Sequence, residues 1–242
     1  MEQVVYEKPR EGVAVIRMNR PERLNAMGQQ MLTELAEAWT DFQNDDSLLV
    51  AILTGTGRGF CVGEDLKESA ERGKPGLGDV RVKDPYFAGE ITKPTIAAVN
   101  GWAIGGGVAF TTLATLRVAA RSAVFEYPQA KHWGVGAFGA GVTENLPVAI
   151  AAELALGFRI TAQRAYEMGW VNRVVDDGQE LDEALQLAEH IVKFRPRTVL
   201  NTVDMLRKVR PALPEAIQAE GAHLRVNGVE GDIMATRRVI PR

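Results

Sequence analysis

The chain has 242 residues, of which 46% are hydrophobic and 24% are charged, a composition typical of a globular protein with a sizeable core. Its formal net charge of −3 and the lack of a lysine or arginine cluster argue against a nucleic-acid partner. The first residues have neither the basic start nor the apolar run of a signal peptide, and no apolar stretch is long enough to cross a bilayer. We therefore expect a cytoplasmic protein without a membrane partner.

The single cysteine, Cys61, excludes an intrachain disulfide framework and a cysteine-rich metal site, and we expect no bound metal. No histidine lies near Cys61 in the sequence to act as its base. We therefore interpret Cys61 as a small buried residue and not as a nucleophile.

Hydrophobic periodicity and turn residues predict alternating strands and helices over the first 175 residues, followed by helices alone. The expected strands are 4–6, 13–18, 49–54, 96–99, 116–120 and 123–125, with the first two and the last two each forming a pair. The expected helices are 28–43, 64–72, one entered at the glycines near 105, one beginning after Thr143, one from Glu180, and those at 197–209 and 214–229. This order predicts an α/β core over residues 1–175 and a helical C-terminal region over residues 176–242.

Two glycine-rich turns follow buried strands, one after Thr54 and one after Val99. The second contains three consecutive glycines, 105–107, which weaken a helix interior but suit a helix entrance that another backbone segment or a ligand approaches closely. The N–H groups at such an entrance suit a phosphate, a carboxylate or the oxygen of a developing enolate. On local pattern alone, tight packing of the helix on its sheet explains the glycines equally well.

A nucleotide-binding protein is another interpretation of these turns, because glycine-rich turns also bind phosphates. Phe60 stands where the third glycine of a dinucleotide fingerprint belongs, and no Gly-Lys-Ser/Thr follows the turn. Both fingerprints therefore fail, and we expect no NAD or other nucleotide cofactor.

The two turns together resemble motifs of the crotonase (enoyl-CoA hydratase/isomerase) superfamily. Its phenylalanine-cysteine-alanine-glycine-alanine-aspartate-leucine stretch appears here as Phe60-Cys61-Val62-Gly63-Glu64-Asp65-Leu66. Its asparagine-glycine-x-alanine-x-glycine-glycine-glycine stretch appears as Asn100-Gly101-Trp102-Ala103-Ile104-Gly105-Gly106-Gly107. A third match, Arg20-Pro21 with Leu24-Asn25-Ala26, lies where the family loop contacts CoA, although a plain connecting loop also explains it.

The resemblance implies a spiral of β-β-α units with a helical C-terminal region, through which members assemble as trimers. It implies that the N–H groups of Glu64 and Gly106 form an oxyanion hole. The residues implied to contact the acyl-CoA are Arg23, Leu24, Ala26, Gly63, Glu64, Asp65, Leu66 and Gly106. We expect no cofactor other than the coenzyme A of the substrate, and a homotrimer or hexamer.

The two glutamates that transfer protons in family hydratases fall at Ala109 and Gln129 in this sequence, and neither side chain transfers a proton at neutral pH. Three other side chains are candidates. Glu144 follows the glycine-rich stretch that in relatives lines the acyl pocket, but it also suits the first turn of its own helix. The ordinary pKa of histidine suits His132 to be a general base, but a partly exposed, non-catalytic loop histidine is the more common case. Glu126 ends a strand, and its side chain can lie on either face.

The sequence therefore predicts an acyl-CoA enzyme that stabilises a thioester enolate. Its reaction is expected to be non-standard: isomerisation, carbon–carbon hydrolysis, decarboxylation or atypical hydration. The loss of both family glutamates leaves a second interpretation open, a non-catalytic acyl-CoA-binding paralogue.

Overall fold

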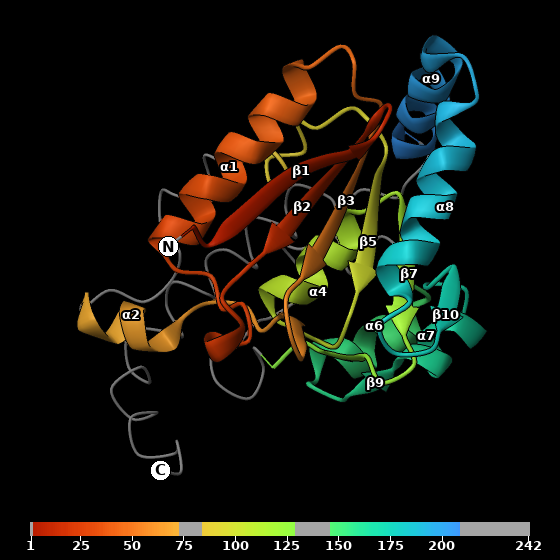
Figure 1. Cartoon of the computed structure of the whole chain (residues 1–242). Coiled ribbons are helices and arrows are strands. Elements are labelled where there is room, and N and C mark those ends of the chain that lie inside the picture. Colours follow the sequence, from red (N-terminus) through yellow and green to blue (C-terminus); the bar gives the residue numbers. More distant parts are fainter. Residues whose placement is uncertain (1, 73–83, 129–145, 209–242) are drawn as a thin grey trace.

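The computed structural model of the chain describes residues 2–72, 84–128 and 146–208 (Figure 1). Its strands are β1 (Val4–Arg10), β2 (Val13–Met18), β3 (Val50–Gly55), β4 (Gly59–Cys61), β5 (Thr95–Val99), β6 (Trp102–Ile104), β7 (Leu116–Ala120), β8 (Val124–Glu126), β9 (Ile160–Thr161) and β10 (Arg173–Val175). Its helices are the 3-10 turn η1 (Pro21–Arg23), α1 (Gln29–Asn44), α2 (Leu66–Glu71), α4 (Gly106–Leu113), α6 (Val148–Ala155), α7 (Ala162–Glu167), α8 (Glu180–Val192) and α9 (Pro196–Lys208).

The larger sheet has the strand order β1-β2-β3-β5-β7-β10 in the described part of the chain. The β1–β2 pair is antiparallel, and the other neighbours are parallel. β3 and β5 are buried at every position, as expected for parallel strands covered on both faces. Alternate residues of these strands therefore belong to two separate apolar cores.

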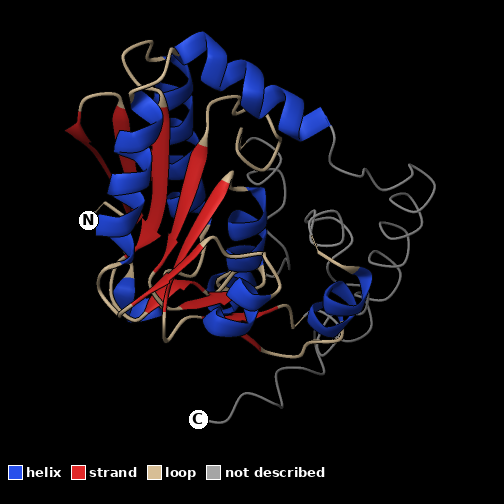
Figure 2. Cartoon of the chain, turned by 90° about the vertical axis from the view of Figure 1, so that its right-hand side faces the viewer, coloured by secondary structure: helices blue, strands red, loops and turns tan. Residues whose placement is uncertain are grey.

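One core contains Ile16, Leu53 and Val99 and lies under α1 and α4. The other contains Val15 and Ile52 and is covered by α8, as Figures 1 and 2 show. Burial of apolar area in the two cores stabilises the sheet between its helices.

A smaller sheet of strand order β4-β6-β8-β9 crosses the end of the larger one among the described residues (Figure 2). The chain leaves the larger sheet on β3, β5 and β7 and enters the smaller sheet on β4, β6 and β8, in that order. After β4 and β6 it continues into a helix, α2 and α4 respectively. This repeat is the predicted β-β-α spiral, and the α/β fold class is confirmed.

Two details of the strand prediction are wrong. The strands at 116–120 and 123–125 do not pair with each other, because β7 lies in the larger sheet and β8 in the smaller one. The second error is that short strands were missed: β4 and β6 were expected to be turn residues, and β9 and β10 were not among the expected strands. So short a strand shows no period-two pattern, and only its sheet partners identify it.

The predicted helices agree with α1, α8 and α9 within one residue or two at each described end. The polar helix expected over 64–72 is shorter, since Asp65 is its N-cap. The helix expected at 214–229 and the residues around Thr143 lie outside the described residues. Helix α8 packs on the larger sheet through Ala184 and Ala188, so it contributes to the second core. The boundary at residue 175 stays a prediction. No helix in the described ranges is long and apolar enough to span a membrane.

Candidate active site at the two glycine turns

The loop before α1 is locked onto the first glycine turn by Asn25, which is fully buried. The Asn25 side chain donates to the carbonyls of Thr56 (3.0 Å) and Gly59 (2.7 Å), and its Oδ1 accepts the N–H of Arg20 (2.8 Å). Asn25 has a φ of 57°, in the left-handed region that asparagine tolerates better than most residues. The loop that resembles the family's CoA-contact segment is therefore held by side-chain-to-backbone bonds.

Asp65 connects the same loop to α2. It is 5% exposed, and its carboxylate lies 2.7 Å from Arg20 Nη1. The same carboxylate caps α2 by accepting the N–H groups of Lys67 (3.0 Å) and Glu68 (3.2 Å). Burial by itself raises the pKa of Asp65, but the Glu68 N–H, the Arg20 charge and the Lys67 N–H outweigh burial and lower it.

The Asp65→Asn variant is expected to be less stable by about 1–3 kcal/mol at neutral pH, because Arg20 loses its buried partner. The lowered pKa means that the stabilisation is complete above the unfolded-state pKa of about 4 and is lost as pH falls through the folded-state value. Urea unfolding of both proteins between neutral and acidic pH measures this. A difference between them that does not shrink on acidification would contradict the assignment.

The end of the first glycine turn, at Glu64, pairs with Met27 in the loop just before α1. Met27 donates its N–H to the Gly63 carbonyl (2.7 Å), and its carbonyl accepts the Asp65 N–H (3.0 Å). Backbone groups of successive residues in an extended segment point in opposite directions, so the N–H of Glu64 points away from Met27.

The second turn begins α4 directly against Gly63. Gly63 has a φ of 84°, and a Cβ added to it would lie 3.1 Å from the Gly106 nitrogen. A Cβ at Gly107 would lie 2.0 Å from the Cys61 carbonyl oxygen, so only glycine allows this approach. Gly106 is the first residue of α4, where N–H groups lack intrahelical acceptors. Glu64 and Gly106 thus lie on facing backbone segments in contact.

The other residues predicted to contact the acyl-CoA differ in their exposure. Ala26 is buried and Leu24 half-buried, whereas Arg23 is exposed and Leu66 is 44% exposed. The structure therefore brings together Gly63, Glu64, Asp65 and Gly106. Gln129, His132 and Glu144 lie outside the described residues.

The structure adds residues that the motif comparison did not single out. Met27 holds the Glu64 segment through its backbone, and its Sδ and Cε lie against Gly106. Ser69 in α2 bonds the Glu64 carboxylate, and Arg72, the C-cap of α2, donates to the Ser69 hydroxyl. Ser69 and Arg72 lie three residues apart in the helix expected over 64–72, and this spacing was the available signal that the two side chains are neighbours.

Burial or ion pairing accounts for three side chains near the site. Ala109 is 1% exposed within α4, so its methyl group is buried. Glu126 is buried, and its carboxylate lies 2.7 Å from Arg159 Nε. Cys61 is fully buried, and burial raises the pKa of its thiol to about 12, as expected for a residue that is not a nucleophile.

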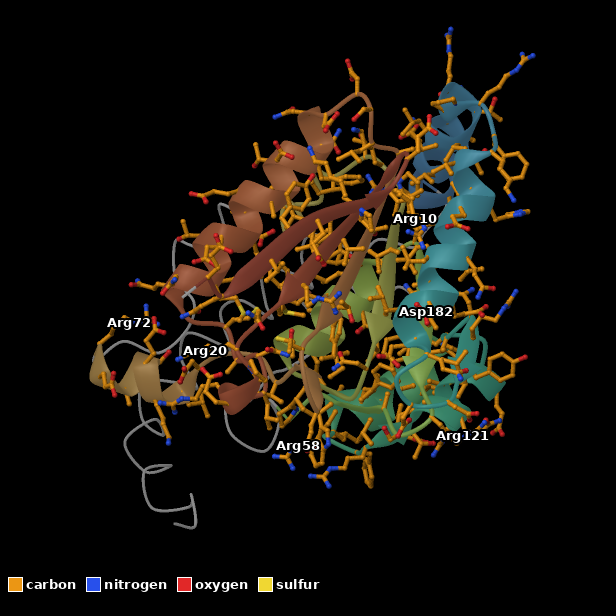
Figure 3. All side chains as sticks on the ribbon, viewed as in Figure 1. Arg10, Arg20, Arg58, Arg72, Arg121 and Asp182 are labelled. Carbon is orange, nitrogen blue, oxygen red and sulfur yellow. The ribbon has the colours of Figure 1, made fainter. Side chains whose placement is uncertain are left out.

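A cleft of about 870 Å³ lies elsewhere, at the carboxyl ends of the larger sheet. Its lining includes Arg17, Arg58, Trp102 and Asp177, and none of the residues predicted to bind CoA. Figure 3 shows Arg20 and Arg72 beside α2, well away from Arg58 and Arg121 at the lower edge. The cleft is therefore distinct from the contact between the two glycine turns.

The matched part of the chain decides the family. The enoyl-CoA hydratase/isomerase family model matches residues 8–229, which include both glycine turns. The chain belongs to the enoyl-CoA hydratase/isomerase family. Its membership in the crotonase superfamily, predicted from the motifs, is confirmed.

Similar proteins support this family over nearly the whole chain. The enoyl-CoA hydratase EchA19 of Mycobacterium tuberculosis is 36% identical over 212 residues, covering 83% of this chain and 79% of that protein. The carnitinyl-CoA dehydratase of Proteus mirabilis is 35% identical over 239 residues, covering 95% of this chain and 88% of that protein. The crystal structure of carnitinyl-CoA hydratase from Mycobacterium avium superposes with a TM-score of 0.85 at 32% identity, covering 96% of this chain and 92% of that protein.

Proposed function

We propose that this family enzyme binds an acyl-CoA thioester and stabilises its enolate with the N–H groups of Glu64 and Gly106. The observation that supports the proposal is the close approach of Gly63 to the Gly106 nitrogen, because it brings together the two backbone segments that carry the proposed donors. Loss of one such donor typically costs about 10²–10³ in rate, so the pair is expected to supply a large part of catalysis.

The reaction that follows the enolate is proposed to differ from two-glutamate hydration. The buried methyl group of Ala109 supports this, because it removes one of the two proton-transfer groups from α4. Gln129 at the second position was identified from the sequence alone. Isomerisation, carbon–carbon hydrolysis, decarboxylation and atypical hydration all begin from the same stabilised oxygen.

The buried Ala109 also favours a second candidate, an acyl-CoA-binding paralogue without catalysis. The two candidates differ in proton transfer, since a binding protein needs an acyl-CoA site but no base. Exchange of the α-proton of a bound thioester therefore separates them.

The proposal is tested by incubating the protein with saturated acyl-CoA thioesters in deuterated water and following the α-proton signal by NMR. The panel includes butyryl-CoA and carnitinyl-CoA, since two relatives are named for carnitinyl-CoA. We expect exchange at least about 10²-fold above the protein-free rate. CoA binding without exchange on any thioester would contradict the enzyme and favour the binding paralogue.

The same assay tests the two base candidates chosen from the sequence, Glu144 and His132. In Glu144→Gln or His132→Gln, loss of exchange with retained CoA binding would identify the base. Exchange at the wild-type rate in both variants would exclude them.

The proposal includes a homotrimer or hexamer, a cytoplasmic location and no cofactor beyond the CoA of the substrate. Large exposed apolar side chains on and beside α6, α7 and α9 support self-association: Val148, Leu156, Phe158, Tyr166, Met205 and Leu206. Sedimentation equilibrium of the full chain measures the assembly, and a monomer would contradict it.

A further inference from the structure

Glu64 carries a side chain that the oxyanion-hole assignment does not use. The family motif has alanine at this position, so a carboxylate here is a departure of this chain from the motif. Glu64 is half-buried, and its backbone is fixed by the two bonds of Met27 to Gly63 and Asp65. The carboxylate therefore starts from the residue whose N–H is proposed to bind the thioester oxygen.

A short hydrogen-bonded chain along α2 supports this carboxylate. Ser69 is 5% exposed, and its hydroxyl bonds Oε1 of Glu64. Arg72 Nη2 donates to the same hydroxyl oxygen at 3.2 Å. The guanidinium places a positive charge beside the hydrogen-bonded pair. Figure 3 shows Arg72 at the α2 side of the molecule.

Other carboxylates next to the two turns have structural partners that fix them. Asp65 pairs with Arg20 and caps α2. Glu68 accepts the N–H of Gln29 at 2.9 Å and so caps α1 from outside that helix. Glu126 pairs with Arg159. Glu64 bonds the hydroxyl of Ser69, which can rotate and re-form its bond when the carboxylate moves.

We propose that the carboxylate of Glu64 is the group that takes and returns the α-proton of the bound thioester. The inference rests on the proposed function. The carboxylate accepts the proton from the α-carbon, the C–H electron pair forms the carbon–carbon double bond of the enolate, and the carbonyl π electrons move onto oxygen. The N–H groups of Glu64 and Gly106 hold that oxygen, and return of a proton to carbon reverses the step. Ser69 and Arg72 act as positioning residues.

This assignment compensates for the methyl group of Ala109. One residue then supplies both a backbone donor for the oxygen and a side-chain base for the adjacent carbon. Because the base and the donor share a residue, their relative position depends on the Met27 bridge and on the Ser69 bond. The base of this chain is thereby moved from α4 to the first glycine turn.

The test is α-proton exchange by Glu64→Gln, Glu64→Asp and Ser69→Ala, with Glu71→Gln as the matched control. Glu71 is an exposed carboxylate on the same helix, outside the site. We expect Glu64→Gln to lower the exchange rate by about 10²–10⁴-fold with CoA affinity unchanged. Glu64→Asp retains a carboxylate and should keep an intermediate rate. Ser69→Ala should lower the rate with KM unchanged, and Glu71→Gln should match the wild type.

The outcomes separate the inference from the proposed function. Wild-type exchange that persists in Glu64→Gln overturns the inference alone, and loss of exchange in Glu144→Gln or His132→Gln would then identify another base. A wild-type protein that binds CoA but exchanges no α-proton overturns both. Melting temperatures and CoA binding of each variant show whether it is folded.

Discussion

The Gly107→Ala variant is expected to lose about 10²–10³-fold of the α-proton exchange rate, the cost of losing one oxyanion donor. The added Cβ would lie 2.0 Å from the Cys61 carbonyl oxygen and 3.0 Å from its carbonyl carbon. Backbone atoms cannot swing aside as a side chain does, so α4 and the first glycine turn must separate. The N–H groups of Glu64 and Gly106 then no longer converge on one oxygen.

The measurement is the exchange rate with butyryl-CoA in deuterated water, together with the melting temperature. Gly169→Ala is the control, because Gly169 also has a positive φ (76°) but meets no atom within 4 Å of the added Cβ. It should cost about 1–2 kcal/mol of stability from backbone strain and leave the exchange rate unchanged. Wild-type exchange in Gly107→Ala would contradict the close approach of the two turns.

The Arg117→Met variant is expected to be destabilised by about 3–5 kcal/mol. Arg117 is 8% exposed, lies in β7 and caps the C-terminus of α4, the helix that begins at Gly106. Its guanidinium donates to the carbonyls of Thr111 (2.8 Å), Thr112 (2.7 Å) and Ala114 (3.0 Å). Methionine fills similar space but leaves these buried carbonyls without their donor and removes a cation from the helix C-terminus.

Urea unfolding and the melting temperature measure the loss, which corresponds to a fall of about 6–20 °C for a chain of this size. The control is Arg121→Met, since Arg121 is 66% exposed and pairs with exposed Asp176 at 3.0 Å. We expect it to cost no more than about 1 kcal/mol, as is usual for surface pairs. Equal effects of the two substitutions would show that Arg117 contributes nothing beyond a surface arginine.

Several features of this protein followed from the sequence by local rules. The alternation of strands and helices predicted the α/β core, and the three glycines at 105–107 predicted a helix entrance that a backbone segment approaches closely. The absence of a histidine near Cys61 predicted a buried cysteine. The family motifs located Glu64 and Gly106 together. Each of these depends on a residue type at a fixed spacing, which the chain displays without its fold.

Three-residue strands and contacts between segments far apart in the sequence could not be predicted from the sequence. β4 and β6 were not recognised, and β7 and β8 were paired with each other, because a short strand is defined by its partner and not by its own pattern. The identity of the acid–base group was also out of reach, since a carboxylate's role depends on what surrounds it.

The sequence by itself thus determined the family motifs, the order of the elements and the loss of a carboxylate at Ala109. Only the tertiary structure decided how the site is held: the Met27 bridge orients Glu64, Asp65 is occupied by Arg20, and Ser69 with Arg72 supports the Glu64 carboxylate. The physical reason is that backbone donors and ion pairs act over a few ångströms. Residues far apart in the sequence reach such distances only after the two sheets and their helices have packed.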